Sequence, residues 1–256
     1  MPFQTLKLEG INILNTSLEE VIYFFKDIFI REKFPLHIIT FNLDFLLNIS
    51  TNSEFRHICS SSDYVFPDGR GITNLLRNKY RIKVNRITGN ELFEVLLNLA
   101  NNENLKVAFI GSSKLVQRQL SNKIKSTFPD LTIAASISPP LFFETNFAEN
   151  EKTVNKLIKC NPDIVFVALG SPRQELWISK IKEIIGAKLY IGVGSAFEYY
   201  TGKKMRAPVL LQRIGLEWFW RMLIEPKRLV KRYLFNDLPF FLKQIKKISL
   251  EQRKFR

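Results

Sequence analysis

Long hydrophobic runs are missing from this 256-residue chain, and cysteine, histidine and glycine are all scarce. No uninterrupted apolar run reaches the roughly 18 residues of a membrane-spanning helix, and the clearest run, 164–169, has the length of a strand. The N-terminus has no basic region followed by an apolar one, so we expect no signal peptide. Cys59 and Cys160 form no disulfide framework or zinc motif, and we expect reduced thiols. These features fit a cytoplasmic chain.

Motifs for metals and common cofactors are also missing. His37 and His57 have no partners at the spacing of a metal site, so we expect structural roles for both. No Asp-x-Asp pair occurs, which argues against the carboxylate pair that many nucleotide-sugar enzymes use to hold a divalent cation. The G-x-G-x-x-G and Walker patterns are absent, which argues against the alternative of a nucleotide-dependent oxidoreductase or methyltransferase on a Rossmann-like sheet. We therefore expect neither a metal nor a cofactor.

The positive charge is concentrated at one end of the chain. The net charge is +14, and residues 203–256 contain 15 basic and four acidic residues, so this segment alone contributes +11. The 46% hydrophobic content is ordinary for a folded protein with a substantial core. We predict an α/β domain over residues 1–202 and a basic C-terminal appendage over residues 203–256.

Short β-rich runs alternate with longer helical patterns. This alternation predicts an α/β fold: a Rossmann-like parallel or mixed sheet flanked by helices, followed by a basic helical appendage. The predicted strands are 36–41, 64–66, 107–110, 132–136, 164–169 and 189–193. The predicted helices are 17–30, 43–50, 71–78, 89–101, 113–128, 149–159 and 173–185.

Polar or glycine-bearing loops follow five of the predicted strands. Ligands of open α/β sheets bind beyond the carboxyl ends of the strands, so these loops predict a pocket for a polar, phosphorylated ligand. The loops are Thr40-Phe41-Asn42, Pro67-Asp68-Gly69-Arg70-Gly71, Gly111-Ser112-Ser113, Gly170-Ser171-Pro172-Arg173-Gln174-Glu175 and Gly192-Val193-Gly194-Ser195.

Each of these loops also has a purely structural interpretation. Asp68 is either a turn aspartate bonded to its own backbone, which the local pattern favours, or a general base held at the pocket. The Gly111 turn suits either an anion at a helix N-terminus or a simple tight turn. Thr40 and Asn42 can cap the helix that follows them.

The loop before the last predicted helix is equally open. Gln174 and Glu175 fit an ordinary first helical turn after Pro172, and the local pattern favours that interpretation.

The appendage combines apolar and basic residues. Leu216 to Leu223 is rich in aromatic residues, and Phe241, Leu242, Ile245 and Ile248 share one helical face opposite three lysines. This pattern favours a helix on an anionic membrane surface. The alternative is a solvated basic face over a packed core. Nucleic acid is not an expected partner, because the usual binding motifs are missing.

Several motifs occur in a fixed order along the chain. In the first half they are Thr40-x-Asn42, Pro67-Asp68-Gly69-x-Gly71, Arg86-x-x-Gly89 and Phe109-Ile110-Gly111. In the second half they are Pro162-Asp163-Ile164, Gly170-x-Pro172-Arg173-Gln174-Glu175, Gly192-Val193-Gly194, Gly202 with Arg206-Ala207-Pro208, Gly215-Leu216-Glu217-Trp218-x-x-Arg221 and Pro226-x-Arg228. Together they resemble the WecG/TagA/CpsF family of bacterial glycosyltransferases over about residues 12–233.

This resemblance implies an inverting, metal-independent transfer of a sugar from a UDP-sugar to a lipid-diphosphate-linked sugar. The best-known members move N-acetylmannosamine or its uronic acid onto N-acetylglucosamine-diphosphate-undecaprenol, for teichoic acid or surface polysaccharide synthesis, and others use donors such as glucose. It further implies a peripheral protein on the inner face of the cell membrane, with an appendage that docks there and completes the active site. A non-enzymatic scaffold for envelope assembly is the rival interpretation, and the sequence indicates no oligomeric state.

The resemblance also assigns roles to residues. Asp68 matches the proposed base, with Thr40 as a second catalytic residue and Asn42 orienting a sugar. The implied substrate-binding residues are Arg86, Gly111, Gln174, Glu175 and Gly194, and the appendage adds Arg213, Arg221 and Arg228 as candidates for stabilising the leaving diphosphate.

The chain departs from the family pattern beside the expected pocket. Ser195 replaces a common glycine, Glu198 a common aspartate, and Tyr199-Tyr200-Thr201 is bulkier than usual. These differences bear on the identity of the sugar.

Overall fold

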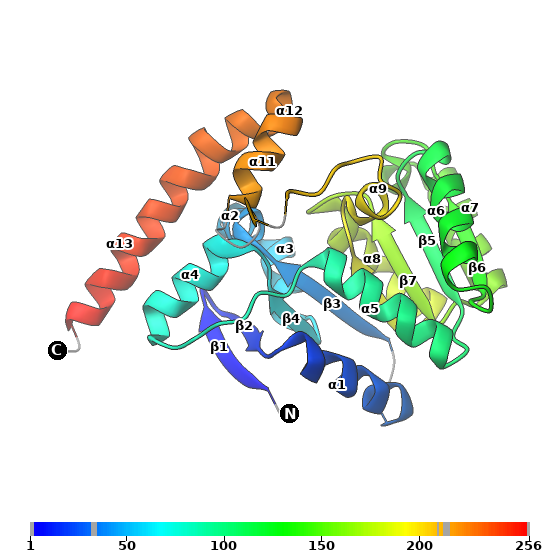
Figure 1. Ribbon diagram of the computed structural model, residues 1–256, viewed down its shortest axis with the longest axis horizontal. Helices are drawn as coiled ribbons and strands as arrows, with labels where there is room; N and C mark the ends of the chain where they lie inside the picture. Colours follow the sequence, from blue (N-terminus) through cyan, green and yellow to red (C-terminus); the bar gives the residue numbers. More distant parts are fainter. Residues whose placement is uncertain (1–2, 32–34, 209, 212–215, 255–256) are drawn as a thin grey trace.

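A six-stranded sheet forms the centre of the protein. The structure is a computed structural model that describes residues 3–31, 35–208, 210–211 and 216–254 (Figure 1). The order of the strands is β4-β3-β8-β7-β5-β6, and every neighbouring pair is parallel. The strands are β3 (Leu36–Phe41), β4 (Tyr64–Pro67), β5 (Val107–Gly111), β6 (Ile133–Ile137), β7 (Ile164–Ala168) and β8 (Leu189–Gly192).

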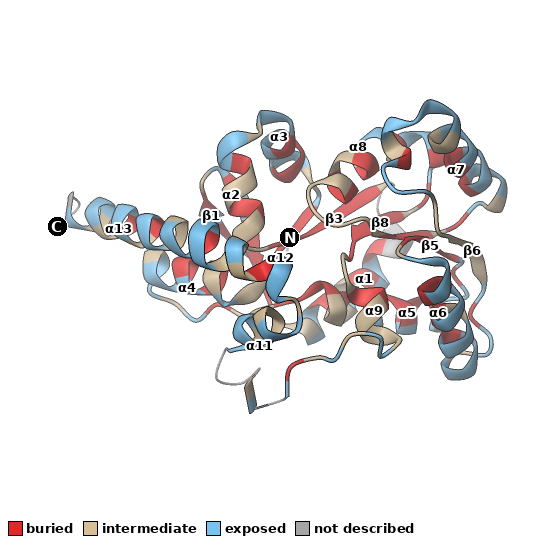
Figure 2. Cartoon of the chain, turned by 90° about the horizontal axis from the view of Figure 1, so that it is seen from above, coloured by how far each residue is buried: buried red, intermediate tan, exposed pale blue. Residues whose placement is uncertain are grey.

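Helices cover both faces of this sheet. One face carries α1 (Leu18–Arg31), α5 (Gly89–Asn102), α6 (Lys114–Thr127) and α9 (Ala196–Tyr200). The other face carries α2 (Leu43–Thr51), α3 (Ser53–Ser61), α4 (Gly69–Tyr80), α7 (Phe147–Cys160), preceded by the short helix η1 (Phe143–Thr145), and α8 (Arg173–Ile185). Figure 2 shows the strands buried between the two layers.

The strands are apolar at almost every position because both faces of the sheet are covered. All six residues of β3 are buried. Its side chains alternate between the layers: Ile38 belongs to the hydrophobic cluster that contains Phe93 of α5, and Ile39 belongs to the cluster that contains Leu75 of α4. The predicted α/β class is confirmed, and the open choice between a parallel and a mixed sheet resolves as parallel.

A small antiparallel hairpin, β1 (Gln4–Leu8) and β2 (Ile11–Asn15), lies outside the predicted elements. Glu9 and Gly10 form its turn with φ of 48° and 89°, and glycine adopts such left-handed angles without strain. Leu6, Leu8, Ile11 and Ile13 join the cluster that also contains residues of α2, α3 and α4, whereas Leu14 joins the cluster on the opposite face of the sheet. Helices α3 and α9 and the short helix η1 were not predicted either. Every helix and strand that was predicted with bounds is present, and its ends differ from the predicted ones by at most two residues.

The C-terminal part of the chain is helical and lies against the α/β domain. It contains α11 (Glu217–Ile224), α12 (Pro226–Lys231), a π-helical segment η2 (Arg232–Asp237) and α13 (Leu238–Lys254), and α13 runs along α4 (Figure 1). Polar contacts also join α13 to the domain: Lys247 Nζ lies 2.6 Å from Glu9 Oε1, and Gln252 donates hydrogen bonds to the Asn78 and Lys79 carbonyls, at 2.6 and 3.2 Å.

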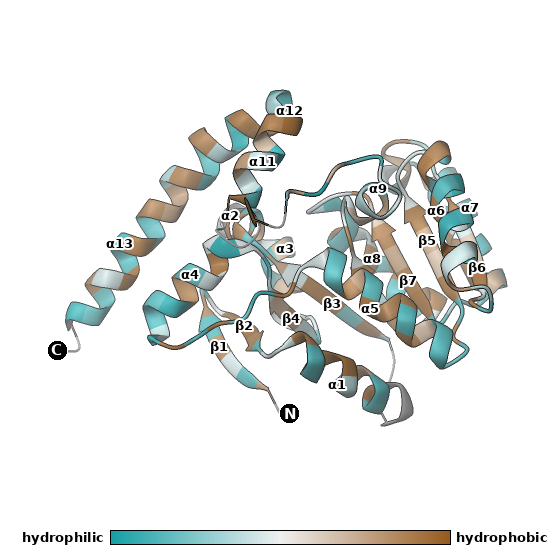
Figure 3. Ribbon diagram, viewed as in Figure 1, coloured by the Kyte–Doolittle hydropathy of each residue, from teal (hydrophilic) through white to brown (hydrophobic). Residues whose placement is uncertain are grey.

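The structure corrects the predicted membrane-facing side of α13. Ile248 is 3% exposed, and Phe241 and Ile245 pack against the cluster around α4. Only Leu242 of the predicted apolar face is exposed. Burial against protein accounts for three of the four apolar residues, and so this face is a packed core with lysines on its outer side. Apolar and polar residues alternate along the helix in Figure 3.

A buried ion cluster makes a second attachment. Asp237 of η2 is 5% exposed and its carboxylate lies 3.5 Å from Arg232 Nε, while Arg232 Nη1 lies 3.9 Å from Asp44 of α2. Burial raises the pKa of Asp237 to about 6, although the Arg232 charge acts in the opposite direction. Of the helices in the described ranges, none is long and apolar enough to cross a membrane.

Candidate active site

The carboxyl ends of β3 and β4 place Asp68 at the edge of the sheet. Phe41 and Pro67 are aligned in the parallel register, and the Asp68 backbone N–H donates a 2.9 Å hydrogen bond to the Phe41 carbonyl. Asp68 occupies the N-cap position of α4, but its side chain makes no capping hydrogen bond. The structural role that the local pattern favoured is therefore not realised, and the carboxylate remains available for chemistry.

The surroundings of Asp68 bring the pKa of its carboxyl group close to neutral pH. Burial raises the pKa of Asp68 to about 6, and the charges of Glu217 and Glu91 act in the same direction. The guanidinium groups of Arg221 and Arg86 act in the opposite direction. Asp68 is thus ionised at pH 7 yet basic enough to accept a proton, which suits a general base.

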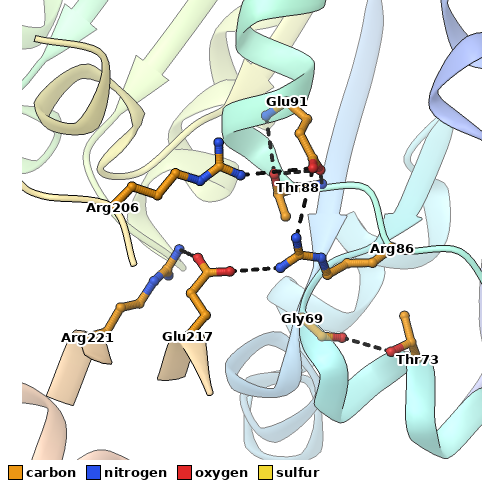
Figure 4. A network of polar contacts seen from close by, with 8 residues as sticks. All are labelled: Gly69, Thr73, Arg86, Thr88, Glu91, Arg206, Glu217 and Arg221. Carbon is orange, nitrogen blue, oxygen red and sulfur yellow. Dashed lines mark hydrogen bonds and ion pairs between the residues drawn. The ribbon is translucent and has the colours of Figure 1, made fainter. Parts of the chain in front are cut away.

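Two arginines from distant parts of the chain meet on the carboxylate of Glu217 (Figure 4). All three of these side chains interact electrostatically with Asp68. Arg86 Nη1 donates to Glu217 Oε2 at 2.8 Å, and Arg221 Nη2 donates to Glu217 Oε1 at 2.9 Å. On the other side, Glu91 Oε1 lies 3.9 Å from Arg86 Nη2 and 4.0 Å from Arg206 Nη2. The result is a chain of alternating charges that runs from α5 to the C-terminal helices.

The charges in this chain stabilise one another. Burial opposes ionisation of Glu217, but Arg221 and Arg86 outweigh it and lower its pKa. Burial also opposes the charged form of Arg221, whereas Tyr199 and Glu217 raise its pKa on balance. The Arg221 guanidinium lies 5.5 Å from the centre of the Tyr199 ring. Both arginines therefore stay cationic in a partly dry site.

Thr40 and Asn42 lie at the end of β3, next to the Asp68 turn. Thr40 is 7% exposed, and its hydroxyl oxygen is 3.4 Å from the position that a Cβ on Gly89 would take. Asn42 Oδ1 accepts a 3.2 Å hydrogen bond from Phe45 N and caps α2. The side-chain oxygen of Asn42 thus has the structural role that its pattern allowed.

Gln174 and Glu175 tie together the loops after β7 and β8. Gln174 Oε1 accepts hydrogen bonds from the backbone N–H groups of Gly170 and Gly194, each at 3.1 Å, while its Nε2 donates to Glu175 Oε1 at 2.7 Å. A methyl group on Gly192 would overlap Gln174 Nε2. Both sides of the Gln174 amide are engaged within the protein, and Gly194 is held in place by it.

Glu175 is almost completely buried in this cluster. It is 1% exposed, and its second oxygen, Oε2, has no hydrogen-bond partner among the described residues. Burial raises the pKa of Glu175 to about 8, although the hydrogen bond from Gln174 acts in the opposite direction. The side chain is therefore protonated at neutral pH.

Gly111 ends β5 with a φ of 101°, where a methyl group would overlap the Ala168 carbonyl oxygen. Only glycine fits this close approach of two strands. The next residue, Ser112, donates a 2.6 Å hydrogen bond to Glu198 Oε1. Glu198, one of the departures from the family pattern, thus anchors the β5 loop from α9.

Two of the predicted arginines cannot be placed. Arg213 lies outside the described residues, and Arg228 belongs to α12 but its side chain is also outside them. The sequence did not single out Glu91, Arg206 or Glu217 as site residues. The sequence does contain a pattern that marks Glu91: Thr88 and Glu91 have the spacing of a capping box, and they form one at the start of α5. Within the described ranges, no group of three or more histidines, cysteines and acidic residues can hold a metal ion.

Comparison with protein families gives the family of the chain. Residues 6–254 match the model of the Glycosyl transferase WecG/TagA/CpsF family. The chain belongs to this family. The resemblance of the ordered motifs is thereby confirmed, and the family name identifies the protein as a glycosyltransferase.

Individual relatives give the same result. The chain is 30% identical over 226 residues to the N-acetylglucosaminyldiphosphoundecaprenol N-acetyl-β-D-mannosaminyltransferase of Bacillus subtilis strain 168. The aligned residues cover 88% of this chain and 86% of the relative. It is 25% identical over 246 residues to the protein of that name in Staphylococcus aureus strain MRSA252, covering 96% and 93%.

Proposed function

We propose that the protein transfers N-acetylmannosamine from its UDP-linked donor to N-acetylglucosaminyl-diphosphoundecaprenol. The observation that carries the proposal is the Asp68 carboxylate, uncapped and with a pKa of about 6, beside two arginines at the carboxyl edge of the sheet. The names of the relatives support the acceptor and the transferred sugar. The donor nucleotide follows from the resemblance to the family.

Asp68 acts as the general base in this mechanism. Its carboxylate takes the proton from the acceptor hydroxyl while that oxygen forms a bond to the anomeric carbon and the bond from this carbon to the UDP oxygen breaks. The configuration inverts, because the attacking and leaving oxygens lie on opposite faces of the sugar. Thr40 and Asn42, on the neighbouring strand end, orient the sugar.

Arginine side chains stabilise the charge that develops on the departing diphosphate. Arg86 and Arg221 are held by their hydrogen bonds to Glu217 within electrostatic range of Asp68. In this proposal their free donors bind the diphosphate on the face of the sugar opposite the Asp68 carboxylate. Charge-assisted hydrogen bonds from guanidinium groups to phosphate oxygens are short and directional. Arg213 and Arg228 remain candidates for the same role, and the loops at Gly111 and Gly194, with Gln174 and Glu175 beneath them, form the floor for the donor.

The exposed side of the C-terminal helices is the proposed membrane contact. Leu223 of α11, Phe235 of η2 and Leu238 of α13 are 59%, 72% and 47% exposed, with Lys231 and Lys243 exposed near them. Apolar side chains bordered by lysines bind anionic lipid surfaces. This surface, and not the face packed on α4, is proposed to hold the protein on the inner face of the membrane.

Vesicle binding tests the membrane contact. Replacing Phe235 and Leu238 together by serine is expected to reduce pelleting with vesicles of phosphatidylglycerol and phosphatidylethanolamine at least tenfold. Tyr23→Ser is the matched control, because Tyr23 is 76% exposed on α1 at the other end of the molecule. Equal pelleting of the double variant and the control would contradict this assignment.

UDP release tests the reaction itself. The purified protein is incubated with a panel of UDP-sugars and a lipid-diphosphate-linked N-acetylglucosamine acceptor in detergent, with and without EDTA. Acceptor-dependent release with UDP-N-acetylmannosamine that survives EDTA is the expected result. Release with UDP-glucose alone would reassign the donor. Vesicle binding without release from any donor would favour the scaffold interpretation.

A further inference from the structure

We propose that Glu217 is a positioning residue of the transfer reaction, whose carboxylate holds Arg86 of the α/β domain and Arg221 of the C-terminal helices beside the general base Asp68. This inference rests on the proposed function and adds a requirement to it. The site becomes complete only when one acidic side chain of α11 bridges the two arginines.

The contacts assign this bridge to one residue. Each carboxylate oxygen of Glu217 serves a different guanidinium, at 2.8 Å for Arg86 and 2.9 Å for Arg221. Arg86 is 131 positions away in the sequence, whereas Arg221 is one helical turn further along α11. Glu217 therefore fixes its own helical neighbour and at the same time joins the appendage to the loop before α5.

The Glu217 side chain is less exposed than either arginine that it binds. It is 13% exposed, compared with 25% for Arg86 and 35% for Arg221. Each guanidinium carries five N–H donors in a planar fork and spends only part of them on Glu217. In the proposed arrangement the other donors bind an anionic substrate group.

Charge gives Glu217 a second effect on Asp68. The charged groups that face Asp68 are Arg86 from the loop before α5, Arg221 and Glu217 from α11, and Glu91 from α5. With Glu217 neutralised, the two arginines are opposed only by Glu91, and so the pKa of Asp68 falls. A lower pKa makes Asp68 a weaker base and moves the acid limb of the activity profile to lower pH.

The experiment separates charge from geometry with two substitutions. Glu217→Gln removes the charge with little change in size. Glu217→Asp keeps the charge on a shorter side chain that cannot reach both arginines. Glu225→Gln is the matched control, because Glu225 is another carboxylate of the same helical region and is paired with Lys204 at 2.9 Å, outside the groups that face Asp68.

The measurements are kcat, KM, the pH dependence of kcat/KM and the thermal unfolding temperature. For Glu217→Gln we expect a loss of kcat/KM of roughly tenfold or more and an acid limb shifted down by about half a pH unit or more. For Glu217→Asp we expect a similar loss of rate with the acid limb in place. Glu225→Gln is expected to stay within about twofold of wild type, with its acid limb unchanged.

A readout without substrate keeps this inference separate from the proposed function. The 13C shift of the Asp68 carboxyl carbon, followed against pH, reports its pKa directly in the full chain. A lower midpoint in Glu217→Gln than in wild type supports the inference even if no UDP-sugar is turned over. An unchanged midpoint, or an unchanged acid limb in an active Glu217→Gln variant, would overturn it. If Glu217→Gln does not fold, Glu217→Asp at wild-type rate overturns it.

Discussion

Replacing Asp68 by asparagine is expected to raise stability while it removes activity. Asp68 has a pKa of about 6 in the folded protein, compared with the ordinary value of 3.8 for an aspartate. A carboxyl whose folded-state pKa is raised binds its proton more tightly in the folded state than in the unfolded state. Folding is therefore disfavoured progressively as the pH rises from about 3.8 to about 6 and this proton is lost.

The size of the effect follows from the two pKa values. A difference of about two units corresponds to about 3 kcal/mol of destabilisation at pH 8, and about 1 kcal/mol at pH 4.5. Asparagine has nearly the same shape and carries no charge, and so the variant escapes this cost. The gain corresponds to a rise of roughly 2–4 °C in Tm for each kcal/mol in a chain of this size.

Urea unfolding of wild type and Asp68→Asn at pH 4.5 and pH 8 measures the gain, and UDP release measures the loss. The expected result is a stability difference that grows by about 2 kcal/mol between the two pH values, together with a loss of turnover of roughly 10²–10⁴-fold. A stability difference independent of pH would refute the electrostatic argument. Turnover within about tenfold of wild type would refute the assignment of the base.

Three further changes test the surrounding structure. Gly192→Ala is expected to lower the free energy of unfolding in urea by about 1–3 kcal/mol, because the new methyl group displaces Gln174. Gly71→Ala is the control, because its Cβ meets only Leu43, at ordinary contact distance. Glu175→Gln is expected to become more stable relative to wild type as the pH rises, by about 1.4 kcal/mol per pH unit between the ordinary glutamate pKa of 4.5 and the folded-state pKa of about 8. A difference in the free energy of unfolding that stays constant across this pH range would contradict a buried, protonated Glu175. Ile248→Ala is expected to lower the free energy of unfolding by about 2–5 kcal/mol, because Ile248 is buried. Leu250→Ala, at a half-exposed position of the same helix, is expected to lower it by less than about 0.5 kcal/mol. Equal Tm values for the two variants would show that α13 is not docked on α4.

The sheet and most of its helices were predictable because the sequence patterns coincide with local physical rules. Strands buried on both faces read as continuous apolar runs, as in the stretch from Ile164 to Ala168. The hairpin was missed because β1 and β2 are half-polar strands whose stability comes from packing against α3 and α4, which no local pattern reports.

Two kinds of signal predicted residues of the candidate site. Asp68 lies where a loop follows a strand, and the resemblance of the ordered motifs added Arg86 and Arg221. The charge bridge that joins these two arginines through Glu217 depends on how the C-terminal helices dock, which neither signal reports. Sequence periodicity correctly grouped Phe241, Ile245 and Ile248 on one face but could not tell whether lipid or protein would cover it. Apolar residues have the same preference for burial in lipid and in protein, and so only the tertiary structure shows which of the two covers this face.

The distance in sequence between Arg86 and Glu217 also sets the order in which the parts of the site are synthesised. At the usual pace of synthesis, about 5–20 residues per second, the 131 residues between them take roughly 7–26 s to make. Throughout that interval the growing chain already contains Asp68 and Arg86, but not the carboxylate that joins Arg86 to Arg221. A polypeptide released after β8 but before position 217 contains all six strands of the sheet and Asp68, but it permanently lacks the carboxylate that joins Arg86 to Arg221.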